Sequence, residues 1–238
     1  MRRPYKNSKE YYDLQAEDLF LGTDVKFYHK GFVGDTAKEF ADYIIKEAGI
    51  KENSDVVEFG CGSGYFTNVL NNLCKVEGIS NSPVNIKVCR ELYPECNFIE
   101  ADMEDHVAED KTHCIALESF NYSNPEKTLL NAHKMLRVGG IFYMKEWMGI
   151  EDDTPEVLAN KETLKDIFCY NPYKTGNILS LAESCGFEVI GIENLSDKIK
   201  MDSYMTTVKY HNEYVLNSSF PHIGVAFVQP MQLKFKKK

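Results

Sequence analysis

Residues 55–67 read DVVEFGCGSGYFT, and this stretch decides the fold class of the chain. The run DVVEF is typical of a buried strand, glycines stand at positions 60, 62 and 64, and a helical pattern follows directly. Glycine has no β-carbon, so a ligand can approach the backbone of such a loop closely. We therefore expect a nucleotide or nucleoside at this turn. A tight strand-to-helix turn without a ligand is the alternative.

The glycine spacing also bears on which nucleotide binds. The dinucleotide fingerprint GxGxxG requires a third glycine where this chain has Tyr65. The match to an NAD-dependent enzyme is therefore imperfect.

Strand-like and helix-like segments alternate along the rest of the chain. Further strands are expected at residues 75–80, 97–102, 114–119, 141–147, 187–194 and near 223–228. Helices are expected at residues 35–48, 67–73, 177–185 and 196–216, after the cap pairs Ser82–Pro83 and Thr154–Pro155, and from Asn124–Pro125 to the glycines 139 and 140. Such alternation requires a mostly parallel sheet covered on both faces. The expected fold class is α/β, with a Rossmann-like, doubly wound sheet of seven strands.

The length of 238 residues predicts one domain with decorations. We assign residues 35–238 to it, with helical lid insertions at about 149–173 and 196–221. Residues 1–34 show no clean period but contain many aromatic residues, so we expect a helical arm or lid rather than a disordered tail. The four lysines at positions 234 and 236–238 are interpreted as a solvated terminus.

Composition limits the partners of the protein. The net charge of -9 argues against non-specific binding to nucleic acid, and no apolar run approaches the length of a membrane span. The N-terminus has no apolar signal-peptide core, and the seven cysteines include no CxxC pair, so we expect a cytoplasmic protein without disulfides. The histidines are scattered, which predicts no metal site.

The segment around Glu58 resembles motif I of the class I methyltransferases that use S-adenosylmethionine (SAM), an acidic residue followed by x and GxGxG after the first strand. The resemblance runs from about residue 35 to the last strand. It implies that Glu58 organises the loop around the methionine part of SAM, and that Gly60, Cys61 and Gly62 pass beneath it. In that family the segments corresponding to FEVIGIEN and HIGVAFVQP form a C-terminal antiparallel hairpin.

The turn after the second strand departs from the family's usual pattern, in which an acidic residue replaces Ser80. The sequence GISNSPVNI resembles the small-molecule branch that includes coclaurine N-methyltransferases, sterol and isoprenoid C-methyltransferases and cyclopropane fatty acid synthases. This implies that Ser80 and Asn81 hold the ribose with Asn85 nearby, although a helix cap is the alternative. The third strand ends EADMED, which resembles the family's adenine site. This implies that Asp102 binds the adenine amine and Met103 packs on the ring; a turn-forming aspartate is the alternative there.

Glu118 ends the fourth expected strand, at the edge where ligands of open α/β sheets bind. It matches a glutamate that lies beside the acceptor in the isoprenoid C-methyltransferases. We expect it to act as a catalytic base or to stabilise a cation. Its alternative role is to orient a backbone amide or the SAM amine. The following strand, IFYMKEW, is interpreted as architectural.

The N-terminal arm supplies further candidates. The sequence YYDLQAEDLFLGTDVKFYHKGF resembles the segment of the same branch that closes over SAM and shapes the acceptor pocket. This makes Tyr11, Tyr12, Tyr28 and His29 candidate acceptor or lid residues, because aromatic faces suit cationic or isoprenoid groups. Pinning the arm to the core is the alternative for each of them.

These patterns predict a SAM-dependent methyltransferase that acts on a carbon or nitrogen atom of a small molecule, isoprenoid-like or an amine. The expected partners are that acceptor and no nucleic acid or membrane, with a homo-oligomer as an open option. The alternatives are an NAD-dependent oxidoreductase, a non-catalytic SAM-binding protein and a lipid-directed cyclopropane synthase.

Overall fold

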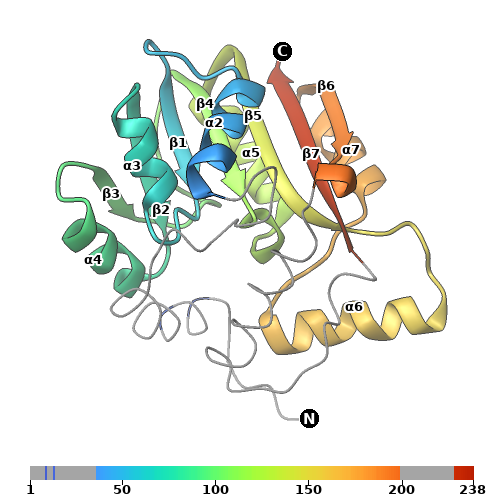
Figure 1. Ribbon diagram of the computed structural model, residues 1–238. Helices are drawn as coiled ribbons and strands as arrows, with labels where there is room; N and C mark the ends of the chain where they lie inside the picture. Colours follow the sequence, from blue (N-terminus) through green and yellow to red (C-terminus); the bar gives the residue numbers. More distant parts are fainter. Residues whose placement is uncertain (1–8, 10–12, 14–35, 199–227) are drawn as a thin grey trace.

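The computed structural model describes residue 9, residue 13 and residues 36–198 and 228–238 (Figure 1). Its centre is one seven-stranded sheet in the order β3-β2-β1-β4-β5-β7-β6. The first five strands are parallel, and β7 runs antiparallel between β5 and β6. The strands are β1 (Asp55–Phe59), β2 (Lys75–Ser80), β3 (Asn97–Glu100), β4 (Lys111–Leu117), β5 (Leu136–Gly149), β6 (Phe187–Asn194) and β7 (Val228–Lys237). The predicted Rossmann-like class is confirmed.

Helices cover both faces of the sheet. One apolar cluster joins α2 and α3 to one face, and another joins α5 and α7 to the other. The α-helices are α2 (Ala37–Ala48), α3 (Tyr65–Asn71), α4 (Pro83–Leu92), α5 (Pro125–Met135), α6 (Pro155–Phe168) and α7 (Thr175–Ser184); 3-10 turns span Phe120–Tyr122 and Ser196–Lys198. Helix α6, in the insertion predicted at 149–173, lies beyond the lower edge of the sheet in Figure 1.

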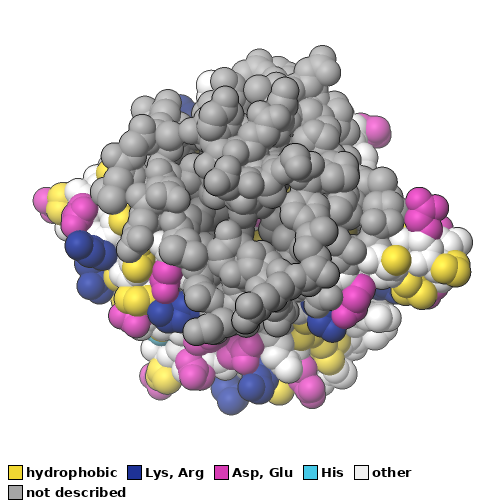
Figure 2. Space-filling view, turned by 90° about the horizontal axis from the view of Figure 1, so that it is seen from below, with side chains coloured by type: hydrophobic (Ala, Val, Ile, Leu, Met, Phe, Trp, Pro, Cys, Tyr) yellow, Lys and Arg dark blue, Asp and Glu magenta, His cyan; other side chains and the backbone are white. Residues whose placement is uncertain are grey.

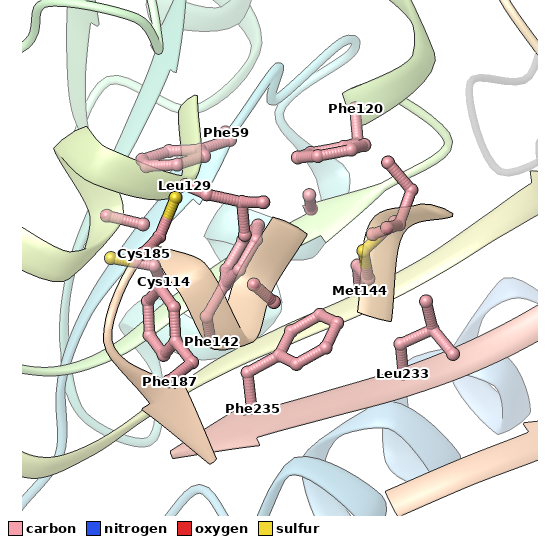
Figure 3. Close-up of a cluster of buried hydrophobic side chains, with 14 of the residues drawn as sticks. Phe59, Cys114, Phe120, Leu129, Phe142, Met144, Cys185, Phe187, Leu233 and Phe235 are labelled. Atoms are coloured by element: carbon pink, nitrogen blue, oxygen red, sulfur yellow. The ribbon is translucent and has the colours of Figure 1, made fainter. Parts of the chain in front are cut away.

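The core on the α5 and α7 face is built around aromatic rings (Figure 3). The ring of Phe142 in β5 lies 6.0 Å from that of Phe59, 6.3 Å from that of Phe187 and 6.1 Å from that of Phe235, between centroids. These rings come from four different strands. Burying an aromatic side chain contributes about 1.5–3 kcal/mol, so this cluster ties the β6 edge of the sheet to its centre.

Local sequence explains where several helices begin and end. Thr36 and Glu39 form a reciprocal capping box at the start of α2, and Gly49 ends that helix in the left-handed conformation. Ser82 caps α4 by accepting from the backbone N–H of Asn85, with Pro83 in the first turn. These starts agree with the sequence predictions.

The prediction that glycines 139 and 140 close a helix is wrong. Helix α5 ends at Met135, and β5 begins with the next residue. The register between β4 and β5 shifts between Lys111 and His113, and Gly139 takes φ 77° there. The glycines therefore accommodate an irregularity in the strand, where a left-handed backbone is needed.

The expected start of the fourth strand at residue 114 is also wrong, because β4 includes the polar residues Lys111, Thr112 and His113. Their burial is compensated by specific partners. The ammonium of Lys111 lies 2.8 Å from the carboxylate of Asp55, and the Thr112 hydroxyl exchanges hydrogen bonds with the Asp55 backbone. Hydropathy alone cannot show that these residues lie inside the sheet.

The last strand lies further along the chain than expected. Strand β7 begins at Val228, while residues 223–227 lie outside the described part of the chain. The lysines interpreted as a solvated tail therefore belong largely to a central strand. Leu233 and Phe235 face the core, and Lys234 pairs with Glu47 of α2 at 2.9 Å. The antiparallel arrangement of β6 and β7 is nevertheless as predicted.

Candidate active site

The predicted site residues gather at one edge of the sheet. Strands β1 to β4 are parallel and adjacent, so their carboxyl ends meet there. The glycine loop follows β1, Ser80 ends β2, Asp102 follows β3 by two residues, and Glu118 follows β4 directly. Figure 2 looks towards this edge, and the described side chains around its rim include both acidic and basic groups.

The glycine loop is fitted tightly on one side and open on another. Gly60 has φ 67°, and a β-carbon there would lie 2.5 Å from the β-carbon of Ser119. Gly62 has φ 50°, and a β-carbon there would meet no atom of the described residues within 4 Å. Between them, the backbone N–H of Cys61 donates to the carbonyl of Ile79 at 2.9 Å. The loop is therefore fixed to β2 and β4 while Gly62 leaves space for a ligand beside the backbone.

Glu58 lies beneath this loop and is buried. Its carboxyl accepts a hydrogen bond from the Thr67 hydroxyl in the first turn of α3. Burial raises the pKa of Glu58 to about 8, although the contacts with Thr67 oppose that rise. The carboxyl thus links β1 to α3 across the glycine turn.

The turn after β2 caps a helix and carries the polar groups expected at the ribose. Ser80 accepts from the Ser82 backbone at 3.2 Å, and Ser82 also donates to the carboxylate of Asp13. Asn85 lies in the first turn of α4, and its buried carbonyl Oδ1 has no hydrogen-bond partner among the described residues. A ribose hydroxyl is a donor that would satisfy such an oxygen. The residues present therefore fit a nucleoside here, in addition to capping a helix.

Asp102 and Met103, the two residues expected at the adenine, lie near this turn and the glycine loop. The Asn81 amide donates to the Asp102 carboxylate at 3.4 Å, so the ends of β2 and β3 are joined. Asp102 also accepts from the Glu104 backbone at 2.9 Å, which is the turn-forming role. The terminal methyl of Met103 would lie 3.8 Å from a β-carbon on Gly60. Met103 thus borders the glycine loop, where it can pack against a ring.

Glu118 has an unusual backbone conformation. Its φ of 56° is left-handed, which costs about 1–3 kcal/mol for a residue with a side chain. Its carboxylate accepts from the ammonium of Lys145 and, at 3.2 Å, from the indole Nε1–H of Trp147. Ser119, the next residue in the sequence, packs against Gly60. Glu118 therefore lies next to a residue that contacts the glycine loop.

Sequence reasoning missed a buried polar cluster on β5, in the stretch interpreted as architectural. Lys145 and Glu146 are fully buried. The Tyr170 hydroxyl lies 2.8 Å from the Glu146 carboxyl and 2.7 Å from the Trp147 carbonyl. Burial, followed by the charge of Glu118, raises the pKa of Glu146 to about 7. Two adjacent charged residues inside the apolar run IFYMKEW were the signal that could have found this cluster.

Asn121 connects this cluster to the end of β4. Its side-chain amide donates to the Trp147 carbonyl and to the Tyr170 hydroxyl, each at 2.7 Å. The ring of Tyr122 packs edge-on against that of Tyr170, with centroids 5.2 Å apart. The insertion predicted at 149–173 therefore does reach the carboxyl edge, through Tyr170.

Some predictions fall outside the described residues, namely Tyr11, Tyr12, Tyr28, His29 and the insertion beyond residue 198. Among the residues that are described, no group of three or more His, Cys, Asp or Glu side chains could hold a metal ion. No helix in the described segments is long and apolar enough to cross a membrane. All seven cysteines are free thiols.

Comparison with known proteins agrees with this geometry. Residues 57–144, which include the glycine loop and the residues after β2, β3 and β4, match the family model described as a methyltransferase domain. This match supports a class I methyltransferase domain that uses SAM. SAM is accordingly its cofactor, and the NAD-dependent alternative is set aside.

Curated relatives and a solved structure are similar to the chain beyond residues 57–144. The chain is 28% identical over 103 residues to trans-aconitate 2-methyltransferase of Enterobacter sp. (strain 638), and the match covers 41% of each chain. It is 23% identical over 212 residues to sterol 24-C-methyltransferase of Schizosaccharomyces pombe, covering 79% of this chain and 55% of that one. The matches thus span about half the length of these relatives. The [4+2]-cyclase SpnF has the same fold, with TM-score 0.75, 16% identity and coverage of 100% of this chain and 97% of that one.

Proposed function

We propose that the protein transfers the methyl group of SAM to a carbon or nitrogen atom of a small acceptor, isoprenoid-like or an amine, and that Glu118 lies at that acceptor. One observation carries the proposal. The Glu118 carboxylate stands at the carboxyl edge beside the Trp147 indole, and Ser119 next to it touches the glycine loop. A carboxylate and an aromatic face beside the cofactor loop suit an acceptor that becomes cationic.

The charge changes of the reaction explain what Glu118 would do. SAM supplies a methyl group on a positively charged sulfur. When the acceptor forms its new bond to the methyl carbon, the sulfur keeps the electron pair of the broken bond, and the acceptor takes up the positive charge. An alkene acceptor becomes a carbocation, and a primary or secondary amine becomes an ammonium, and each then has a proton to lose. The Glu118 carboxylate stabilises this charge and receives that proton.

The relatives support a small acceptor without fixing its class. One is named for a sterol carbon and another for trans-aconitate, a carboxylic acid. A protein named as a cyclase shares the fold, so the fold alone does not define the reaction. The lid role of residues 1–34, including Tyr11, Tyr12, Tyr28 and His29, stays a prediction.

The first experiment measures binding and turnover separately. Calorimetric titration with SAM, S-adenosylhomocysteine and NAD should show binding of the two adenosyl compounds alone. Release of S-adenosylhomocysteine is then measured with geranyl diphosphate, sarcosine and trans-aconitate as probes of carbon, nitrogen and oxygen acceptors. Methylation of geranyl diphosphate or sarcosine supports the proposal. Methylation of trans-aconitate alone contradicts it, and binding of SAM without turnover of any probe favours a non-catalytic role.

The role of Glu118 is tested by Glu118→Gln, which keeps the size of the side chain and removes its charge. We expect turnover to fall at least about tenfold while the affinity for SAM stays within about twofold. The matched control is Glu188→Gln on the exposed face of β6, which should leave both quantities unchanged. Full turnover by Glu118→Gln would exclude a catalytic role for this carboxylate.

A further inference from the structure

Lys145 is the least expected residue of β5. Its side chain is fully buried in the middle of a strand that is otherwise apolar over residues 141–144. Burying a lysine is costly unless its charge is paired. A neutral side chain of similar length would fill the same space without that cost, so the charge calls for an explanation.

The ammonium of Lys145 is held by three described groups. It donates to Oε1 of Glu118, and it lies 5.2 Å from the centroid of the Trp147 ring and 6.0 Å from that of Phe40. The Trp147 indole N–H donates to the same carboxylate oxygen. One oxygen of the Glu118 carboxylate therefore accepts from a charged donor and from a neutral donor together.

The backbone of Glu118 is also fixed to the same lysine. Its N–H donates to the Lys145 carbonyl at 2.8 Å. Alternation along β4 places Leu117 with the α2 cluster and Ala116 with the opposite one, so an extended Glu118 would point away from α2. The left-handed φ of Glu118 instead turns its carboxylate to the side on which Lys145 meets Phe40 of α2.

Exposure separates the roles of the two partners. The Glu118 side chain is 28% exposed, whereas that of Lys145 is 0% exposed. The carboxylate can therefore meet a molecule at the edge of the sheet, while the buried ammonium can act on such a molecule through the carboxylate.

We propose that Lys145 is a positioning residue for methyl transfer, whose buried ion pair holds the Glu118 carboxylate directed towards the acceptor. The inference rests on the proposed function, because it gives Lys145 a purpose only if Glu118 lies at the acceptor. It goes beyond that function because it assigns a role to the buried charge of Lys145. It also predicts that Lys145 and Glu118 act together in methyl transfer.

A test independent of activity uses the single tryptophan of the chain. Trp147 gives one indole N–H resonance in a proton–nitrogen correlation spectrum, and its hydrogen donates to Glu118. Lys145→Met should shift this resonance by more than its linewidth, as should Glu118→Gln. The control is Lys234→Met in β7. It breaks the ion pair of Lys234 with Glu47 of α2 and should leave the resonance in place. An unmoved resonance in folded Lys145→Met would overturn the proposal.

The kinetic test is a double-mutant cycle on the probe acceptor that the wild-type protein methylates. Lys145→Met should lower kcat at least about tenfold, with the SAM affinity within about twofold and normal cooperative unfolding. In the Glu118→Gln background, the same substitution should have little further effect. An equal additional loss in that background would overturn the proposal, because Lys145 would then act independently of Glu118.

The two proposals fail in different ways. If the wild-type protein methylates none of the probes while Lys145→Met shifts the indole resonance, the proposed function fails although the ion pair holds the carboxylate. If Glu118→Gln lowers turnover but Lys145→Met changes neither kcat nor the resonance, the positioning role fails and the proposed function stands.

Discussion

Gly60 packs directly against Ser119, since a β-carbon on the glycine would lie 2.5 Å from the β-carbon of the serine. The Ser119 hydroxyl donates to the carbonyl of Phe59 at 2.6 Å, so the contact joins the ends of β1 and β4. This is where the glycine loop meets the residue beside Glu118. The loop and the candidate acceptor site are therefore in direct contact through Ser119.

The contact predicts different outcomes for two glycines of one loop. Gly60→Ala should lower the free energy of unfolding by about 2–4 kcal/mol, because the new methyl group overlaps Ser119 and the backbone is left-handed. Gly62→Ala adds a methyl group to open space at φ 50° and should cost only about 1 kcal/mol. Its main effect should be weaker SAM binding. Denaturant unfolding and calorimetric titration measure the two effects, and equal loss of stability in both variants would contradict the packing.

The buried carboxyl of Glu58 predicts a specific pH dependence of stability. Its folded pKa of about 8 is above the ordinary value of 4.5, so the folded state keeps a proton that the unfolded state has lost between these values. Stability from this group should therefore be present below pH 4.5 and should fall as the pH rises towards 8. Glu58→Gln removes this dependence.

Urea unfolding of both proteins from pH 5 to pH 8 provides the measurement. The wild-type protein should lose about 3 kcal/mol relative to Glu58→Gln across that range. The exposed Glu52→Gln should follow the wild-type curve. Parallel curves for the wild type and Glu58→Gln would show that Glu58 is ionised in the folded protein at neutral pH.

Two neighbouring residues test the position of β7. Phe235→Ala should lower the free energy of unfolding by about 3–5 kcal/mol, because the ring is fully buried between Phe142 and Phe187. Lys236→Ala on the exposed face should change it by less than about 0.5 kcal/mol. Thermal or urea unfolding measures both. If Phe235→Ala were tolerated as well as Lys236→Ala, the end of the chain would be the solvated tail that its lysines suggest.

Sequence alone determined the elements whose signals are local. The bounds of β1, β2 and β6 are those expected from their apolar runs, and the glycine loop follows β1 as its spacing predicts. The cofactor followed from the resemblance of that loop to a known motif, which the comparison over residues 57–144 supports. These features depend on neighbours within a few residues, so periodicity and turn chemistry are enough to find them.

Only the tertiary structure decided the features that depend on distant partners. Lys111 lies inside β4 because Asp55 compensates its charge, and the lysine-rich end is a central strand because β5 and β6 flank it. Likewise, Lys145 is buried because Glu118, 27 positions away in the sequence, turns towards it through a left-handed backbone. A buried charge is tolerated only when its partner is in place, and a linear sequence does not show which residues the fold brings together.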